Sequence, residues 1–154
     1  MITTHKRVIN HNSVPQVLLY VEVVRTHEYL AAESNKLFKK HKTSQVQYNV
    51  LRILYFRGRE EGLPVTEIRE RLINTLPDVT RIADRMVKAG LVERTNDPSD
   101  RRVVRVKITE KGEELLLQLD QPVLKLHRQQ FRHLSPSELK RLVNLLKTIR
   151  AARC

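Results

Sequence analysis

The chain has 154 residues, which is enough for one domain with a hydrophobic core and too few for two comfortable ones. Its 29 Lys and Arg outnumber its 17 Asp and Glu, giving a formal net charge of +12. Polyanions are natural partners of such a chain, although an ordinary soluble protein can show a similar excess. A single cysteine, Cys154, excludes an internal disulfide framework, and no uncharged apolar run could cross a bilayer, so we expect a cytoplasmic protein without a membrane partner.

The first half of the chain predicts three helices. Apolar residues recur every three or four positions from 14 to 40, which indicates a long first helix. Thr43 and Ser44 are N-cap residues for a second helix, and Gly58 marks its end. A short third helix follows at 65–72, with an apolar face formed by Val65, Ile68 and Leu72.

A fourth helix is expected to begin at Thr75-Leu76-Pro77-Asp78. This segment is typical of a capping box, with Thr75 as the cap and an acid three residues later. Gly90 ends the helix. One side of the helix is apolar, and basic residues occupy the others. The apolar side consists of Val79, Ile82, Ala83 and Met86, and the other sides carry Arg81, Arg85 and Lys88.

A hairpin and two further helices complete the expected order. The segments 91–96 and 103–108 predict strands, and the second alternates apolar with charged residues. The six residues between the strands are turn formers and charged side chains, so the hairpin has a long basic tip. A long helix follows residues 109–112, with Pro122 expected to kink or break it, and a capping box at 135–138 opens the last helix.

The middle of this order matches a helix-turn-helix, because two short helices and a tight connection precede a capped helix with a basic outer face. A helix is about as wide as the DNA major groove, so one that is anchored by its apolar face can present the other to base edges. The hairpin then has the place of a wing, where Arg101 and Arg102 can reach phosphate or the adjacent minor groove. A solvated turn whose charges pair locally is the alternative, and the preceding helix favours the wing.

Four short patterns occur in order and at the right spacing between residues 78 and 112. They are T-R-x-x-D-R-M, the G-L-V-E-R exit from the helix, the D-P-x-D-R-R wing and the T-E-K-G entry into the next helix. Together they closely resemble the MarR family of multiple-antibiotic-resistance-type regulators. The resemblance implies a winged helix-turn-helix dimer in which the N- and C-terminal helices of two chains intertwine. Pro77 and Asp78 are less usual for the family.

The expected fold is therefore mainly α with a small β-hairpin wing. On this basis residues 1–154 are one MarR-like domain, with a DNA-binding lobe at 43–109 and dimerisation helices at 14–40 and 110–152. The apolar faces of the first and last helices agree with this division, because they offer more apolar surface than a small lobe needs.

The resemblance places the DNA contacts on the recognition helix and the wing. Asp97 and Asp100 are expected to brace the wing arginines rather than touch DNA. Asp78 is either a helix cap or a base reader that accepts a hydrogen bond from cytosine N4, and the cap is preferred. The expected DNA-binding residues are Thr75, Pro77, Asp78, Thr80, Arg81, Arg85, Arg101 and Arg102.

The resemblance also implies a small lipophilic or phenolic effector, bound between the dimer helices and the DNA-binding lobe. For any one of the candidate residues, an ordinary role as an amphipathic core residue is favoured over a role in lining the pocket. The candidates are Tyr20, Tyr29, Tyr48 and Tyr55.

Other chemistry finds little support. The six histidines do not pair at three- or four-residue spacing, and the sequence has no phosphate loop, nucleophile elbow or paired catalytic carboxylates, so we expect no metal, no cofactor and no enzyme activity. The expected function is that of a ligand-responsive transcriptional repressor that binds a palindromic double-stranded operator as a homodimer. A basic winged-helix RNA-binding or ribosome-associated protein is the alternative, and the low aromatic content, 5% of residues, disfavours it.

Overall fold

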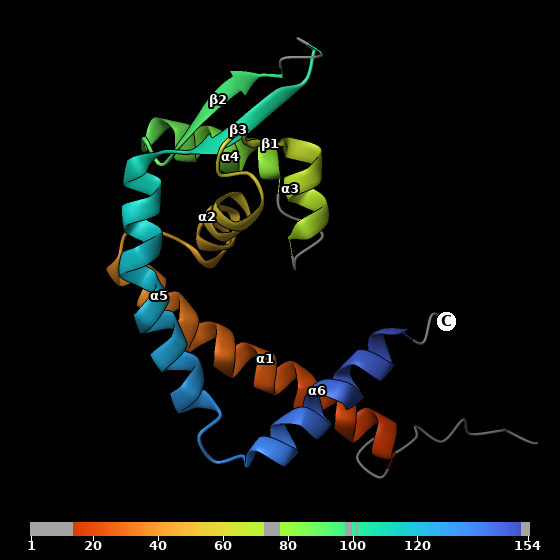
Figure 1. The fold of residues 1–154 in the computed structure, drawn as a ribbon. Helices are drawn as coiled ribbons and strands as arrows, with labels where there is room; N and C mark the ends of the chain where they lie inside the picture. The colour runs from red at the N-terminus through yellow and green to blue at the C-terminus, as the bar shows by residue number, and fades with distance from the viewer. Residues whose placement is uncertain (1–13, 73–77, 98–99, 101, 152–154) are drawn as a thin grey trace, which may run out of the picture.

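The computed structural model describes residues 14–72, 78–97, 100 and 102–151, and its helices form a curved frame with a small sheet at one end (Figure 1). We call the part from α2 to β3 the lobe, and the three helices α1, α5 and α6 the arm. In chain order the elements are α1 (Pro15–Lys40), α2 (Gln45–Arg57), β1 (Leu63–Pro64), α3 (Val65–Arg71), α4 (Val79–Lys88), β2 (Val92–Asn96), β3 (Val104–Ile108), α5 (Glu110–Gln130) and α6 (Pro136–Ala151).

The predicted N-cap of α2 and the predicted capping box of α6 are both present, and Ser44 at α2 is part of a capping box as well. The Ser44 hydroxyl accepts the Gln47 N–H at 3.3 Å, and the Gln47 side chain accepts the Ser44 N–H at 3.1 Å. At α6 a Glu138 carboxylate oxygen accepts the Ser135 N–H at 2.8 Å and its hydroxyl at 2.7 Å. These bonds satisfy N–H groups that have no partner inside the helix, which explains why the two helices begin where they do.

The sheet has three antiparallel strands in the order β1-β3-β2. Val106 of the central strand lies opposite Leu63 on one side and Arg94 on the other. Val104, Val106 and Ile108 lie on the same face of β3, and this face closes the core at Val106 and Ile108, which are buried, while Val104 near the tip of the hairpin is exposed. The hairpin of β2 and β3 confirms the prediction, whereas β1 was not predicted because two residues are too short to show alternation.

The core lies inside the lobe. Leu51 and Leu54 of α2, Ile68 of α3 and Met86 of α4 are all 0% exposed, and they pack with the inner residues of β2 and β3. Leu119 of α5 joins them with no exposed surface. The lobe therefore holds a continuous hydrophobic core that the first half of α5 completes.

Helix α5 leaves the sheet at a tightly packed corner. Gly112 lies so close to the carbonyl of Leu91 that any side chain there would collide with it. The Thr109 hydroxyl accepts the Gly112 N–H at 3.1 Å and donates to the Gly90 carbonyl at 2.7 Å. The helix continues through Pro122 to its end, so the expected break does not occur, since the residues on both sides of the proline pack into the core.

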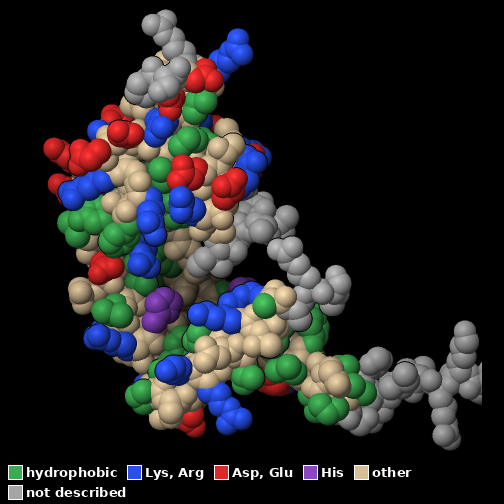
Figure 2. Space-filling model, turned by 45° about the vertical axis from the view of Figure 1, so that its right-hand side comes forward, with side chains coloured by type: hydrophobic (Ala, Val, Ile, Leu, Met, Phe, Trp, Pro, Cys, Tyr) green, Lys and Arg blue, Asp and Glu red, His purple; other side chains and the backbone are tan. Residues whose placement is uncertain are grey.

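The arm leaves apolar side chains open to water. Helix α6 has no buried residue, and hydrophobic side chains are visible along the arm in the lower part of Figure 2. None of the described helices is both long and apolar enough to span a membrane. The exposed large hydrophobics on α1 and α6 are Leu18, Leu19, Tyr20, Val23, Val24, Tyr29, Leu142, Val143, Leu145 and Ile149.

Candidate nucleic-acid interface

Helix α4 is anchored by its apolar face and capped by Asp78. Val79 and Ile82 are buried, while Thr80 on the opposite side is exposed. The Asp78 carboxylate accepts the Arg81 N–H at 3.2 Å, which is the cap that the sequence favoured. The helix thus begins later than the expected box at Thr75, because the short side chain of an aspartate caps a helix as well as a threonine does.

The exposed face of α4 is basic. Arg81, Arg85 and Lys88 are exposed and form no ion pair with the described part of the chain. Asp84 lies between them in sequence, and it is paired with Arg94 of β2, which offsets its negative charge. The face therefore presents a net positive charge, a property that favours a polyanion. A groove of about 610 Å³ runs over it, lined by Asp78, Arg81, Ile82, Asp84, Arg85 and Lys88.

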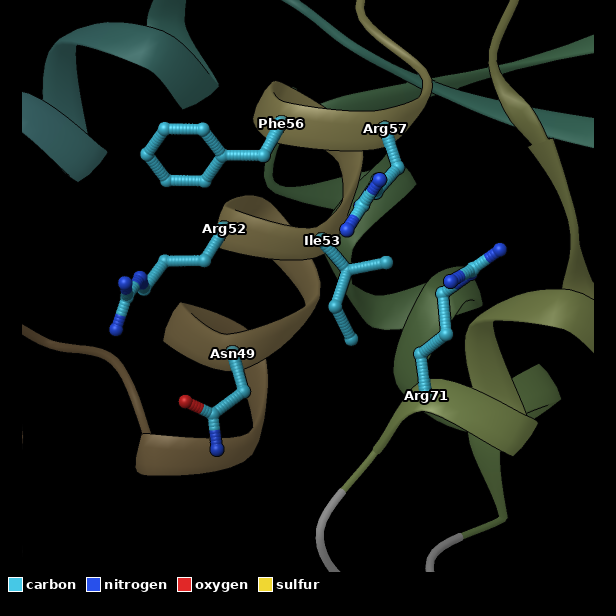
Figure 3. Close-up of a pocket in the computed structure, with 6 residues that line it drawn as sticks. All are labelled: Asn49, Arg52, Ile53, Phe56, Arg57 and Arg71. Atoms are coloured by element: carbon cyan, nitrogen blue, oxygen red, sulfur yellow. The ribbon is translucent and has the colours of Figure 1, made fainter.

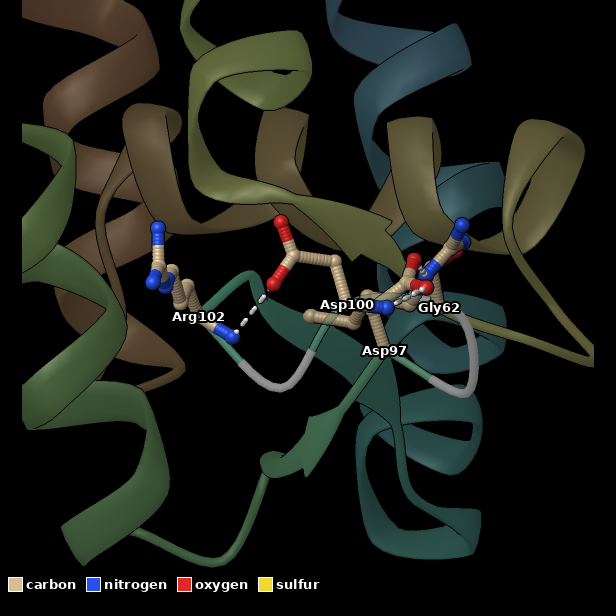
Figure 4. A network of polar contacts seen from close by, with 5 residues as sticks. Gly62, Asp97, Asp100 and Arg102 are labelled. Atoms are coloured by element: carbon tan, nitrogen blue, oxygen red, sulfur yellow. Dashed lines mark hydrogen bonds and ion pairs between the residues drawn. The ribbon is translucent and has the colours of Figure 1, made fainter.

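The wing is held by a network of polar contacts at its base (Figure 4). The Asp97 carboxylate accepts a hydrogen bond from Nε of Arg105 at 2.6 Å, and Arg105 also donates to the Gly62 carbonyl at 3.0 Å. Asp97 accepts the Asp100 N–H at 3.2 Å, and Asp100 accepts the Arg102 N–H at 2.9 Å. The exposed Arg102 guanidinium is thus left to solvent while its backbone is fixed. The hydrogen bond with Asp97 raises the pKa of Arg105.

Several site residues fall outside these observations. Thr75, Pro77 and Arg101 lie outside the described residues, so their predicted roles stay predictions. Sequence reasoning missed Arg105, which ties the wing to the loop before β1, and Arg94, which pairs with the recognition helix. The alternation of β3 marked Arg105 as outward-facing, but its partner depends on how the turn folds back.

The four candidate pocket tyrosines lie at separate places in the protomer. Tyr20 and Tyr29 are exposed on α1, and Tyr55 is half-buried in the lobe. Tyr48 is buried with its ring centroid 5.4 Å from that of Phe38, and burial raises the pKa of its hydroxyl. The described residues do not bring the four tyrosines into one pocket, so the pocket stays a prediction.

One ion pair connects the lobe with the arm. Arg59 donates from Nε and Nη2 to the two carboxylate oxygens of Glu113, at 2.9 and 2.7 Å. Its guanidinium carbon lies 4.7 Å from the centroid of the Tyr55 ring. The hydrogen bond with Glu113 raises the pKa of Arg59. This two-point contact, supported by the aromatic ring, restricts the angle between the loop after α2 and the start of α5.

Comparison with known proteins identifies the family. The sequence model of the MarR family matches residues 43–104. The uncharacterized HTH-type transcriptional regulator YkoM of Bacillus subtilis is 32% identical over 130 residues, which cover 84% of this chain and 82% of YkoM.

Solved structures agree with this assignment. A MarR transcription factor from Planctomyces limnophilus is 36% identical, with a TM-score of 0.68 and coverage of 92% of this chain and 99% of that one. A cysteine-to-serine variant of E. coli MarR, solved in complex with operator DNA, is 25% identical, with a TM-score of 0.77 and the same two coverages. The chain belongs to the MarR family of HTH-type transcriptional regulators.

Proposed function

We propose that the chain is a transcriptional repressor of the cytoplasm that binds a palindromic double-stranded operator as a homodimer. The observation that carries the proposal is the exposed face of α4, where Arg81, Arg85 and Lys88 have no carboxylate partner among the described residues. A helix fixed by its buried face can enter the major groove with such a surface. A dimer seated on a promoter represses by excluding the polymerase, and nothing in this function requires catalysis.

The dimer is supported by the uncovered apolar faces of α1 and α6. A single chain leaves Leu145 and Ile149 of α6 about half exposed, at 54% and 52%. A second copy that covers the same faces removes them from water and repeats the basic helix by two-fold symmetry. Two such helices on one side of a duplex bind half-sites about one helical turn, roughly 10 base pairs, apart.

Different residues have different roles in this proposal. Arg81 and Arg85 are placed to read base edges, because they lie on the exposed face of α4. Arg102 and Arg101 of the wing contact phosphate or the minor groove. Asp78 acts as the cap of α4, and the N–H groups of the first turn are suited to a phosphate. The remaining proposed DNA contacts are Thr75, Pro77 and Thr80.

The alternative of RNA binding lacks a stacking surface. Residues 78–108, which include the recognition helix and the wing, contain no Phe, Tyr or Trp. Sequence-specific RNA-binding proteins stack unpaired bases on such rings. Duplex DNA is therefore the better partner for this basic surface.

The proposal also includes a small effector whose binding lowers the affinity of the dimer for DNA. The resemblance to the MarR family favours a lipophilic or phenolic molecule between arm and lobe, with the four tyrosines as candidate lining residues. Tyr48 and Tyr55 contribute from α2, and Tyr20 and Tyr29 contribute from α1.

Selection of bound sequences from random duplex DNA tests the proposal. We expect an inverted repeat, which establishes the dimer and the readout together. Arg81→Ala is then expected to reduce discrimination against a wrong base by about 1–3 kcal/mol, because a base contact is lost. Arg102→Ala should weaken binding to all sequences and lower the salt slope by about one. Arg128→Ala, which changes an exposed residue of α5, is the control. Failure of the protein to bind duplex DNA at low salt would contradict the proposal.

A further inference from the structure

The recognition helix α4 ends in a turn that closes on its own backbone. The Gly90 N–H donates to the Val87 carbonyl at 2.9 Å. The Leu91 N–H donates to the Met86 carbonyl, also at 2.9 Å. Gly90 has a φ of +71°, which glycine adopts without strain, so the turn is a Schellman motif. The carbonyls at the exit of the helix, those of Ala89, Gly90 and Leu91, still need partners from elsewhere.

The start of α5, which lies beside the end of α4 in Figure 1, provides all three partners. The Lys111 ammonium donates to the Ala89 carbonyl at 2.7 Å. The Thr109 hydroxyl donates to the Gly90 carbonyl at 2.7 Å. The Thr109 N–H donates to the Leu91 carbonyl at 3.2 Å. Two residues at the start of α5 therefore hold three consecutive carbonyls at the end of the recognition helix.

Charge strengthens the contact that Lys111 makes. The aligned peptide dipoles of α4 leave a partial negative charge at its C-terminal end, where a cation is stabilising. The Lys111 side chain also lies across Gly90, since a Cβ added to that glycine would lie 3.7 Å from Cδ and 3.8 Å from Nζ of the lysine. Glu114 is three residues further along α5, yet Lys111 forms no ion pair with the described part of the chain. The ammonium therefore binds α4 rather than a carboxylate of its own helix.

We propose that Lys111 and Thr109 are positioning residues for the readout of DNA, because they fix the end of α4 and so keep its exposed arginines in place against the bases. This role rests on the proposed function, whereas the contact between α5 and α4 does not. A helix rises about 1.5 Å per residue, so Cα of Arg81 lies about 10 Å from Cα of Lys88. A tilt of about 10° at the held end moves Arg81 by roughly 2 Å, which is more than a hydrogen bond to a base edge tolerates. Phosphate contacts by long side chains carry no sequence information, so specificity should be lost before affinity.

Amide hydrogen exchange on the free protein tests the contact without DNA. Lys111→Met keeps most of the side-chain stem but removes the ammonium, so the N–H groups of Gly90 and Leu91 should exchange at least about fivefold faster, while that of Leu54 in the core is unchanged. Lys111→Arg can still donate and should restore most of the protection. The matched control is Lys125→Met, another exposed lysine of α5. Unchanged exchange in Lys111→Met, or an equal increase in the control, overturns the proposal.

The DNA readout is tested with the selected operator and with a copy that carries one wrong base pair in each half-site. In Lys111→Met the ratio of the two Kd values should fall about tenfold. The Kd for a scrambled duplex and the salt slope should match those of Lys125→Met, and Lys111→Arg should recover the ratio. An unchanged ratio overturns the positioning role. An equal loss for both operators, with a salt slope lowered by about one, makes Lys111 a phosphate contact and also overturns it.

Thr109 gives a second, independent variant. Thr109→Val removes the hydroxyl with little change of shape and should lower the same ratio, and Thr109→Ser should restore it. Thermal unfolding is followed in parallel, because the hydroxyl also accepts the Gly112 N–H. A ratio that Thr109→Ser does not restore contradicts the role of the hydroxyl. If the protein binds no duplex at all, the proposed function fails, while hydrogen exchange still decides whether Lys111 holds the end of α4.

Discussion

The lobe and the arm differ in where their apolar residues are covered. In the lobe Leu51, Leu54, Ile68 and Met86 have no exposed surface, so one chain completes that core. In the arm α6 buries no residue at all, although its sequence is as regularly apolar as that of a core helix. An amphipathic helix gains most of its stability from tertiary packing. A single chain is therefore enough to cover the apolar residues of the lobe, whereas those of the arm need the second copy of the proposed dimer to cover them.

The largest expected effect is a loss of stability of the lobe. Leu54→Ala removes a side chain that is 0% exposed, and it should lower the free energy of unfolding by about 2–5 kcal/mol through lost burial and the cavity left behind. Urea denaturation measures the change. Val104→Ala on the wing, where the side chain is 40% exposed, is the control and should stay within about 1 kcal/mol. Equal losses in the two variants contradict the idea of a core closed within one chain.

A second test separates the arm from the lobe. The double variant Leu145→Glu, Ile149→Glu puts two charges on the face of α6 that the partner should cover. We expect the dimer dissociation constant to rise at least about 100-fold, since burial of an unpaired charge is strongly unfavourable. Sedimentation equilibrium measures it, while far-UV circular dichroism and urea denaturation follow the lobe.

The control for this test is Lys147→Glu, which changes the charge of an exposed α6 residue that is not apolar. The lobe of the double variant should remain folded as a monomer. A dimer that persists unchanged at micromolar concentration refutes the assignment of this face.

The fold was predictable where local rules act alone. The caps Ser44 and Ser135 are followed three residues later by Gln47 and Glu138, so sequence distance and spatial contact coincide. The start of α4 was misplaced because two segments offered good caps, and the local pattern alone does not choose between them. The hairpin was predictable because β2 and β3 are adjacent in the chain.

The candidate site was predictable only in part, because some of its contacts join distant residues. Arg81 and Arg85 followed from helical periodicity around the buried face. The contact of Arg105 with the Gly62 carbonyl joins residues 43 positions apart, and it depends on how β1 pairs with β3. The hollow between α2 and α3 (Figure 3) depends on how the two helices pack, because its lining residues, Arg57 and Arg71 among them, come from both. No local pattern contains that information.

A smaller effect is expected where the lobe meets the arm. A double-mutant cycle of Arg59→Gln and Glu113→Gln should give a small favourable coupling, since exposed ion pairs contribute little even when, as here, two N–H groups donate to both carboxylate oxygens. Thermal unfolding measures the coupling. Glu114→Gln replaces Glu113→Gln in a control cycle, because Glu114 is its exposed neighbour on α5. Equal coupling in both cycles shows that the Arg59 contact does not join the two regions.

The smallest effect concerns the start of α6 and depends on pH. Hydrogen bonds from the hydroxyl and N–H of Ser135 lower the pKa of Glu138 below its ordinary value. A carboxyl whose pKa is lower in the folded state stabilises that state above its unfolded pKa, about 4.3, and this contribution disappears as pH falls through the folded value. Between pH 6 and pH 3 the wild type should therefore lose slightly more thermal stability than Glu138→Gln.

The acid-dependent difference should be confined to the arm. Amide hydrogen exchange is the sharper measurement, because the first turn of α6 should lose protection on acidification in the wild type while the core amides of α2 keep theirs. In Glu138→Gln the protection of that turn should be lower at pH 6 and nearly independent of pH, since the amide oxygen accepts the same hydrogen bonds more weakly. If α2 loses protection at the same pH as α6, the two regions unfold as one unit, and the distinction between a self-sufficient lobe and a dependent arm is wrong.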